Sequence, residues 1–126
     1  MPLKRGLAAS DYCYITTAGR VTGRPHTVEI WFAAAKETLY VLAGGRHDAD
    51  FVKNAKKSPD VRIRVGDERF SARARVVEGG SEDALARRVL LAKYAPGYSG
   101  DLSGWGRDAL VVAFDLEARL DHAETG

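Results

Sequence analysis

A short basic loop at residues 19–26 carries the side chains in this sequence that are best suited to hold an anion. It supplies cationic donors, a hydroxyl and two glycines, in the order Gly19, Arg20, Thr22, Gly23, Arg24 and His26. Charge-assisted hydrogen bonds from arginine are about twice as strong as neutral ones. Cations so close together repel one another unless an anion lies between them, so the loop favours a phosphate site. A solvated hairpin tip, charged for solubility, is the alternative that the sequence leaves open.

A second candidate is the glycine pair Gly44-Gly45, which follows an apolar run and precedes Arg46. Glycine allows a flat ligand or another backbone to come close. Arg46 would add a second contact to an anion. An ordinary turn from a strand into a helix is the alternative reading of these residues.

The rest of the sequence contains no arrangement that is typical of catalysis by protein side chains. The histidines are scattered, the single cysteine is Cys13, and neither a G-x-S-x-G element nor a pair of carboxylates stands out. We therefore expect no metal site and no intrachain disulfide. A site for a flat anion without a protein nucleophile is typical of proteins whose cofactor does the chemistry.

Composition places the chain among ordinary globular domains. Its 126 residues fit a single domain over 1–126, and residues 1–10 and 117–126 are expected to be loose ends. The net charge of +2 argues against a general nucleic-acid binder. No apolar run approaches the roughly 20 residues of a membrane span, and the first residues do not resemble a secretory signal. We therefore expect a cytoplasmic protein without a membrane span.

Hydrophobic periodicity predicts the elements that position these residues. Six strands are expected at Tyr12–Thr17, Thr27–Ala33, Thr38–Leu42, Val61–Val65, Arg69–Val77 and Ala109–Leu116. Helices are expected from Asp48 or Asp50 to Lys56 and after an N-cap at Ser81, with a Gly- and Ser-rich loop over Ala95–Asp108. Because most strands follow one another without helical crossovers, we predict an α+β, mainly β fold: a small antiparallel barrel with two covering helices.

Alternation along the second predicted hairpin places five arginines on one face, which we call the arginine surface. They are Arg62, Arg64, Arg69, Arg73 and Arg75. Like charges opposed on a sheet are destabilising, so an acidic group is expected to meet them. Candidates are Glu68, Glu78, a partner subunit or an acidic ligand, and the alternative is a solvated face screened by water.

Aromatic side chains complete the set of candidate residues. Trp105 lies between two glycines, which favours a lid over a flat substrate rather than a core anchor. For Phe51 and Tyr94 the sequence favours core packing, while Trp31 and Tyr98 remain candidates for contact with a substrate.

The loop, the glycine pair and the order of elements together resemble the deazaflavin-dependent nitroreductase family. This family belongs to the flavin- and deazaflavin-binding split β-barrels, which include the pyridoxamine 5'-phosphate oxidases. The resemblance covers roughly residues 12–115 and is most specific at Thr16–His26. Further matches are Gly44-Gly45 and, after it, Phe51, Asn54 and Pro59.

The resemblance implies a six-stranded split barrel that binds coenzyme F(420), with FMN as the alternative cofactor. It places the phosphate at Arg20, Thr22, Gly23 and His26, with Arg24 replacing the basic residue that the family has where this chain has Val21. It places the deazaflavin ring along Ala43, Gly44, Gly45 and Arg46, with its edge closed by Phe51 and Asn54. It places the substrate against Trp31, Tyr94, Tyr98 and Trp105, of which Tyr94 and Tyr98 are candidate proton donors.

Three functions follow as hypotheses. The first is hydride transfer from reduced F(420) to a small electron-poor acceptor, such as a quinone, an enone or a nitro compound. The second is an FMN-binding split-barrel reductase or oxidase, and the third is a non-enzymatic module for an acidic ligand. The oligoglutamate tail of F(420) would occupy the arginine surface, whereas FMN would leave it without a partner. We also expect a homodimer, because split barrels often pair across a sheet face.

Overall fold

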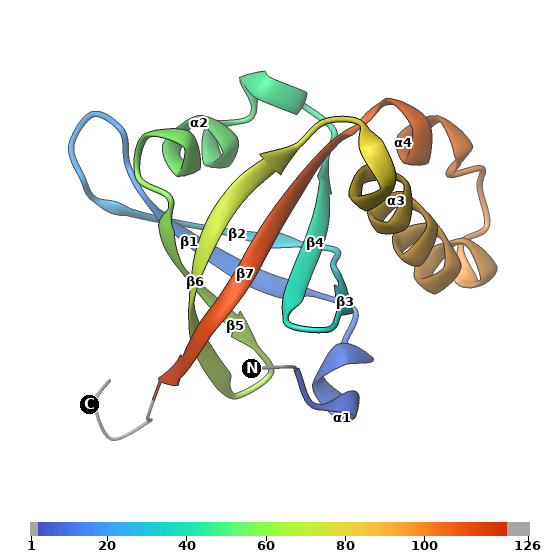
Figure 1. Ribbon diagram of the computed structural model, residues 1–126, viewed down its shortest axis with the longest axis horizontal. Helices are drawn as coiled ribbons and strands as arrows, with labels where there is room; N and C mark the ends of the chain where they lie inside the picture. The colour runs from blue at the N-terminus through green and yellow to red at the C-terminus, as the bar shows by residue number, and fades with distance from the viewer. Residues whose placement is uncertain (1–2, 121–126) are drawn as a thin grey trace.

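The computed structural model describes residues 3–120, which form one curled sheet with helices on both of its faces (Figure 1). The strands are β1 (Cys13–Ala18), β2 (Pro25–Ile30), β3 (Ala33–Ala35), β4 (Thr38–Ala43), β5 (Asp60–Val65), β6 (Glu68–Val77) and β7 (Leu110–Leu120). The helices are α1 (Arg5–Ala8), α2 (Asp50–Lys57), α3 (Gly80–Tyr94) and α4 (Ser103–Asp108), with 3₁₀ turns η1 (Arg46–Asp48) and η2 (Ala95–Gly97).

The sheet has the order β2-β1-β5-β6-β7-β4-β3, and every neighbouring pair is antiparallel. The predicted mainly β, antiparallel class is therefore confirmed. A β-bulge between Ser71 and Ala72 shifts the register of β6 against β7. Bulges bend a strand and increase its twist, which helps a long sheet to curl towards a barrel.

Two hydrophobic cores lie on the two faces of this sheet. The concave face holds the larger core, in which Phe70 and Phe114 are buried and against which Val52 and Ala55 of α2 pack. The opposite face of β4 and β7 packs against α3 in the second core. The buried stripe of α3 consists of Ala86, Leu90 and Tyr94, at the i, i+4 and i+8 spacing of one helix face.

The structure has seven strands where six were expected, because the predicted strand Thr27–Ala33 is interrupted. The backbone N–H of Phe32 donates to the hydroxyl of Tyr94 at 3.0 Å, and its carbonyl accepts from the ammonium of Lys93 at 2.8 Å. With its backbone committed to α3, Phe32 leaves the β1 ladder. The next residues pair with β4 as the separate strand β3.

The helices also differ from the expected two. Residues Ala95–Asp108, expected as a loop, contain η2 and α4. Gly106 allows α4 to pack on α3, since a Cβ there would lie 2.6 Å from a methyl group of Leu91. The expected cap at Ser81 is wrong: α3 begins at Gly80 after Gly79, whose N–H donates to the Asp83 carboxylate at 3.0 Å.

The expected loose ends contain regular structure within the described residues. Helix α1 forms near the start, and Lys93 donates to the carbonyl oxygens of Ala8 and Ser10 at 3.0 and 2.7 Å. At the other end, β7 continues to Leu120. The remaining parts of those predictions, residues 1–2 and 121–126, lie outside the described residues.

Candidate anion-binding site beside helix α2

A groove of about 610 Å³ lies between the β1–β2 loop and α2. It brings together six of the residues predicted to bind a cofactor: Arg20, Thr22, Arg24, His26, Phe51 and Asn54. Gly19, Val21, Thr27, Val28 and Asp50 complete its wall. The basic loop and α2, which are far apart in the sequence, thus line one groove near the left-hand edge of the view in Figure 1.

The loop is closed by its own backbone. The N–H of Gly19 donates to the Arg24 carbonyl and the N–H of Gly23 donates to the Gly19 carbonyl, both at 2.8 Å. Gly23 has φ +78°, which favours glycine. A Cβ on Gly19 would lie 2.8 Å from the ring of His26. The N–H groups of these two glycines are therefore committed to the loop, and the glycines shape the site rather than offer donors to a ligand.

Helix α2 holds Arg20 through three side chains. The Oδ1 atom of Asn54 accepts from the backbone N–H of Arg20 at 3.1 Å and from its guanidinium at 2.9 Å. Asp50 accepts a further guanidinium hydrogen bond at 3.1 Å, and the ammonium of Lys57 donates to the Arg20 carbonyl at 2.6 Å. The loop is therefore fixed to the helix before any ligand arrives.

Asn54 can hold the loop in this way because it is itself buried and fixed. Its side chain is 3% exposed, and its Nδ2 donates to the Thr17 hydroxyl at 3.2 Å in the core. A buried amide is stable only when its hydrogen bonds are made. The position of Arg20 is thus set by the fold of β1 and α2 together.

Two hydrogen-bond donor side chains of the groove remain available. Arg24 and His26 are exposed, and neither side chain has a hydrogen-bond or ion-pair partner among residues 3–120. The Thr22 hydroxyl accepts from the backbone N–H of Arg24 at 3.2 Å and keeps its own proton to donate. An incoming anion would therefore meet Arg24, His26 and Thr22, while Arg20 already shares its charge with Asp50.

The glycine turn lies apart from the groove wall. Gly44, Gly45 and Arg46 are exposed at the end of β4, whereas Ala43 is buried. A Cβ on Gly44 would meet nothing within 4 Å, so this turn faces open space. Arg46 has φ +55° and its guanidinium donates to the carbonyl of Asp108, which ties the turn to α4.

The predicted substrate-side aromatics form one cluster around Trp31. Its ring stacks on Tyr94 at 4.4 Å and meets Tyr98 and Trp105 edge-on at 5.9 and 5.5 Å. The cluster packs in the α3 layer, not in the core that borders the groove. It follows the far end of β2, about 20 Å along the strand from the basic loop. The structure therefore does not bring these aromatics to the groove.

Tyr94 is held as a structural residue within this cluster. It is 9% exposed, and its hydroxyl lies 2.7 Å from the Asp11 carbonyl oxygen and 2.9 Å from that of Phe32. Burial raises the pKa of Tyr94 to about 12. Because the Tyr94 hydroxyl is held by backbone carbonyls and does not ionise readily, Tyr94 is a poor proton donor. The Tyr98 side chain is 47% exposed and is not held in this way.

The arginine surface is exposed as predicted, but its acidic partners are other residues than Glu68 and Glu78. Arg73 pairs with Asp60 at 3.2 Å, and Arg75 pairs with Glu82 at 2.6 Å and Asp115 at 2.7 Å. Arg64 lies over the ring of Tyr14 at 4.1 Å. Within the described part of the chain, this leaves Arg62, Arg64 and Arg69 without an acidic partner.

Sequence reasoning missed Asp50 and Lys57. Together with Asn54 they occupy positions i, i+4 and i+7 of α2, which places all three on one face of the helix. That spacing was visible in the sequence. What the sequence could not show is that this face turns to the basic loop, 30 and more residues earlier in the chain.

The fold is a curled antiparallel sheet that bends towards a barrel, with a groove of exposed donor side chains beside α2. A family model described as F420H(2)-dependent quinone reductase matches residues 3–116. This chain belongs to that family, and the predicted resemblance is confirmed. None of the curated proteins compared matches the sequence significantly.

Solved structures agree with this fold. An F420-H2 dependent reductase has a TM-score of 0.66 and 21% identity, covering 93% of this chain and 98% of its own. An FAD-binding protein from Mesorhizobium loti has a TM-score of 0.69 and 15% identity, covering 90% and 84%. A heme storage protein from Vibrio cholerae has a TM-score of 0.67 and 22% identity, covering 94% and 92%. At such identities these likenesses establish the fold alone.

Two absences hold for residues 3–120, which the structure describes. No helix among them is long and apolar enough to cross a membrane. No three of their His, Cys, Asp or Glu side chains come together as metal ligands would.

Proposed function

We propose that this protein is an F(420)-dependent reductase that holds the coenzyme phosphate in the groove beside α2. Its substrate is a small electron-poor acceptor, such as a quinone, an enone or a nitro compound. Family membership supports the coenzyme. The observation that carries the site is the pair of exposed donor side chains, Arg24 and His26, which have no partner among residues 3–120 and lie on the wall of a groove whose loop is already fixed.

The residues of the groove fit a phosphate monoester. Arg24 and His26 would donate to its oxygens, and Thr22 would add its hydroxyl. Arg20 would contribute charge from its fixed position beside Asn54. When bound, the reduced deazaflavin would supply the hydride. The chain's own residues would bind and orient it, since no protein nucleophile is needed.

For the contacts to the deazaflavin ring, we keep the residues that the family resemblance implies. Ala43, Gly44, Gly45 and Arg46 form the turn that we assign to the deazaflavin, because a flat ligand can approach the open side of Gly44. Phe51 is 9% exposed and lines the groove, so it is the aromatic residue that we place at the ring edge. Protonation of the acceptor falls to solvent or Tyr98.

One observation favours F(420) over FMN. A depression of about 230 Å³ on the arginine surface is lined by Arg62, Arg64 and Arg69 and shares Thr27 with the groove. An anionic tail that leaves the groove past Thr27 would therefore reach Arg62 and Arg69, which have no acidic partner in the described part of the chain. The glutamates of F(420) provide such a tail, whereas FMN has none.

The test is a side-by-side titration of the purified protein with F(420) and FMN, followed by cofactor fluorescence. Tight F(420) binding with weak FMN binding, together with oxidation of F(420)H₂ by added quinones or enones, supports the proposal. The reverse order of affinities favours an FMN-binding reductase or oxidase. F(420) binding without turnover for any acceptor favours a binding module, and no binding of either cofactor refutes the phosphate site.

The expected homodimer remains a prediction beside this proposal. Light scattering of the purified protein gives its mass in solution, and a monomer would overturn the expectation.

A further inference from the structure

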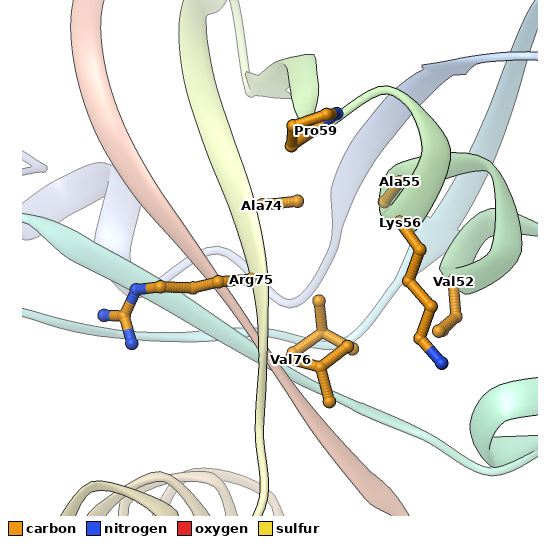
Figure 2. Close-up of a pocket in the computed structure, with 8 residues that line it drawn as sticks. Val52, Ala55, Lys56, Pro59, Ala74, Arg75 and Val76 are labelled. Carbon is orange, nitrogen blue, oxygen red and sulfur yellow. The ribbon is translucent and has the colours of Figure 1, made fainter.

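A second cavity, of about 250 Å³, lies on the other side of α2 (Figure 2). Its apolar wall comes from α2, from β6 and β7 and from the turn after α2: Val52, Ala55, Pro59, Ala74, Val76 and Val112. It shares no lining residue with the groove of the basic loop. The two sites therefore occupy opposite flanks of the same helix.

The volume limits what this cavity can hold. An engineered apolar cavity of about 150 Å³ binds benzene, and pockets for drug-sized ligands span about 300–1,000 Å³. At about 250 Å³, this cavity suits a molecule of one or two rings.

Two basic side chains, Lys56 and Arg75, line the cavity. Lys56 extends from α2 alongside the apolar wall (Figure 2). Arg75 contributes to the lining, but its guanidinium points away in the same view and pairs with Glu82 and Asp115. The ammonium of Lys56 is therefore the cation available to a ligand here.

The hydrogen bonds of Lys56 leave it able to receive an anion. Its ammonium has three donors and no acceptor, so it donates to Nδ1 of His47. The other ring nitrogen of His47, Nε2, lies 3.3 Å from the Glu78 carboxylate. His47 thus separates Lys56 from the acid, and two N–H donors of Lys56 remain for a ligand.

We propose that this cavity is a second ligand site, which binds a small apolar molecule of one or two rings that carries a carboxylate. The rings replace water against the apolar wall, and the carboxylate pairs with Lys56. A single cation beside an apolar wall matches one negative charge, in contrast to the several cations of the groove. The proposal does not depend on the proposed function.

The test is a titration with 2-naphthoate, followed by amide chemical shifts in ¹⁵N-labelled protein, with 2-naphthalenemethanol as the neutral probe of the same shape. Saturable shifts are expected at residues 52–59 and 74–76. Lys56→Gln is expected to weaken 2-naphthoate binding about threefold to tenfold and to leave the alcohol unchanged. Lys53→Gln is the matched control, because Lys53 is an exposed lysine of the same helix outside the cavity.

Variants that fill the cavity provide a second test of the site. Val76→Phe and Ala74→Leu each place extra carbon atoms in the cavity, and either variant that keeps a cooperative thermal transition should lose both probes. The site is refuted if no saturable shifts occur, if shifts map to residues 19–28 instead, or if the filled variant binds as the wild type does. Equal effects of Lys56→Gln and Lys53→Gln refute the carboxylate pairing.

Discussion

The Oδ1 atom of Asn54 accepts two hydrogen bonds from Arg20, one from its backbone and one from its guanidinium, at 3.1 and 2.9 Å. A single buried amide thereby fixes both the path of the basic loop and the direction of one of its charges. A loop that is ordered in advance does not lose conformational entropy when a ligand binds. The anion site therefore depends on a residue that need not touch the anion.

Replacing Asn54 tests this relationship. Asn54→Leu should lower the free energy of unfolding by about 2–3 kcal/mol, because it leaves the buried Thr17 hydroxyl and the Arg20 N–H without their partner. Asn54→Asp keeps the acceptor for Arg20 and should recover most of the loss. Urea unfolding at neutral pH measures both variants. Equal stability of Asn54→Leu and the wild type would show that this amide does not hold the loop.

Arg24 and Arg20 should separate binding from stability. Arg24→Ala should weaken F(420) binding by about 1.5–3 kcal/mol and change the unfolding free energy by less than about 0.5 kcal/mol, because the Arg24 side chain is exposed and has no partner among residues 3–120. Arg20→Ala should reduce both quantities, since it also releases the contacts to Asn54 and Asp50. Cofactor titration and urea unfolding are the measurements.

The control for these variants is Arg88→Ala, which removes an exposed arginine on α3, away from the groove. It should leave F(420) affinity unchanged. A similar loss of affinity in Arg88→Ala and Arg24→Ala would mean that net charge, rather than the groove, attracts the coenzyme.

Patterns among residues close together in the sequence predicted the elements that depend on local interactions. Alternation over residues 61–65 and 69–77 predicted the β5–β6 hairpin, whose register pairs Ile63 with Phe70 in the core. The cations of the basic loop were visible as a cluster because they are adjacent in sequence. That Phe51 and Asn54 of α2 belong to the same site as this loop was implied only by the family resemblance, because about 30 residues separate the two segments.

Features that depend on contacts between residues far apart in the sequence could not be predicted. The break after β2 depends on Tyr94, which lies 62 residues beyond Phe32. The partners of Arg75 come from α3 and from β7, and parity along a strand cannot identify them. The placement of Trp31 on the α3 side follows from that same break, so the sequence could not separate it from the groove.

Acid should remove the contribution of the Arg75 network. Hydrogen bonds from Arg75 lower the pKa of Glu82 and of Asp115. Since the folded values lie below the unfolded ones, the stabilisation is complete above the ordinary carboxyl pKa and is lost as the pH falls through the lowered values. These side chains are each about a third or more exposed, so solvent screens the pairs and Arg75→Gln should cost only about 1 kcal/mol at pH 7.

The difference between the wild type and Arg75→Gln should shrink from about pH 5 to about pH 3. Urea unfolding at several pH values measures it. Arg73→Gln is the control, because its pair with Asp60 is more exposed, at 58% and 81%, and should contribute less at every pH. A difference that grows towards acid would contradict the assigned role of the network.

Lys93 should control the N-terminal segment. Its ammonium donates to three carbonyl oxygens, those of Ala8, Ser10 and Phe32, and lies 3.7 Å from the centre of the Phe32 ring. Lys93→Met should speed amide exchange at residues 3–10 and lower the unfolding free energy by about 2 kcal/mol. Lys53→Met, at an exposed position, should change neither. Unaltered exchange in Lys93→Met would mean that Leu3 and Leu7 alone hold the segment on the core.

Cys13 should report when the core opens. The side chain is fully buried in β1, and burial raises the pKa of its thiol to about 12. Thiol reagents react with the thiolate, so at pH 8 the folded protein should react only through opening of β1. A disulfide reagent that releases a chromophore measures this rate, and the whole signal comes from one residue because the chain has a single cysteine. The rate should rise in Asn54→Leu as its stability falls, whereas rapid stoichiometric labelling of the wild type in native buffer would contradict the packing of Cys13 in the core.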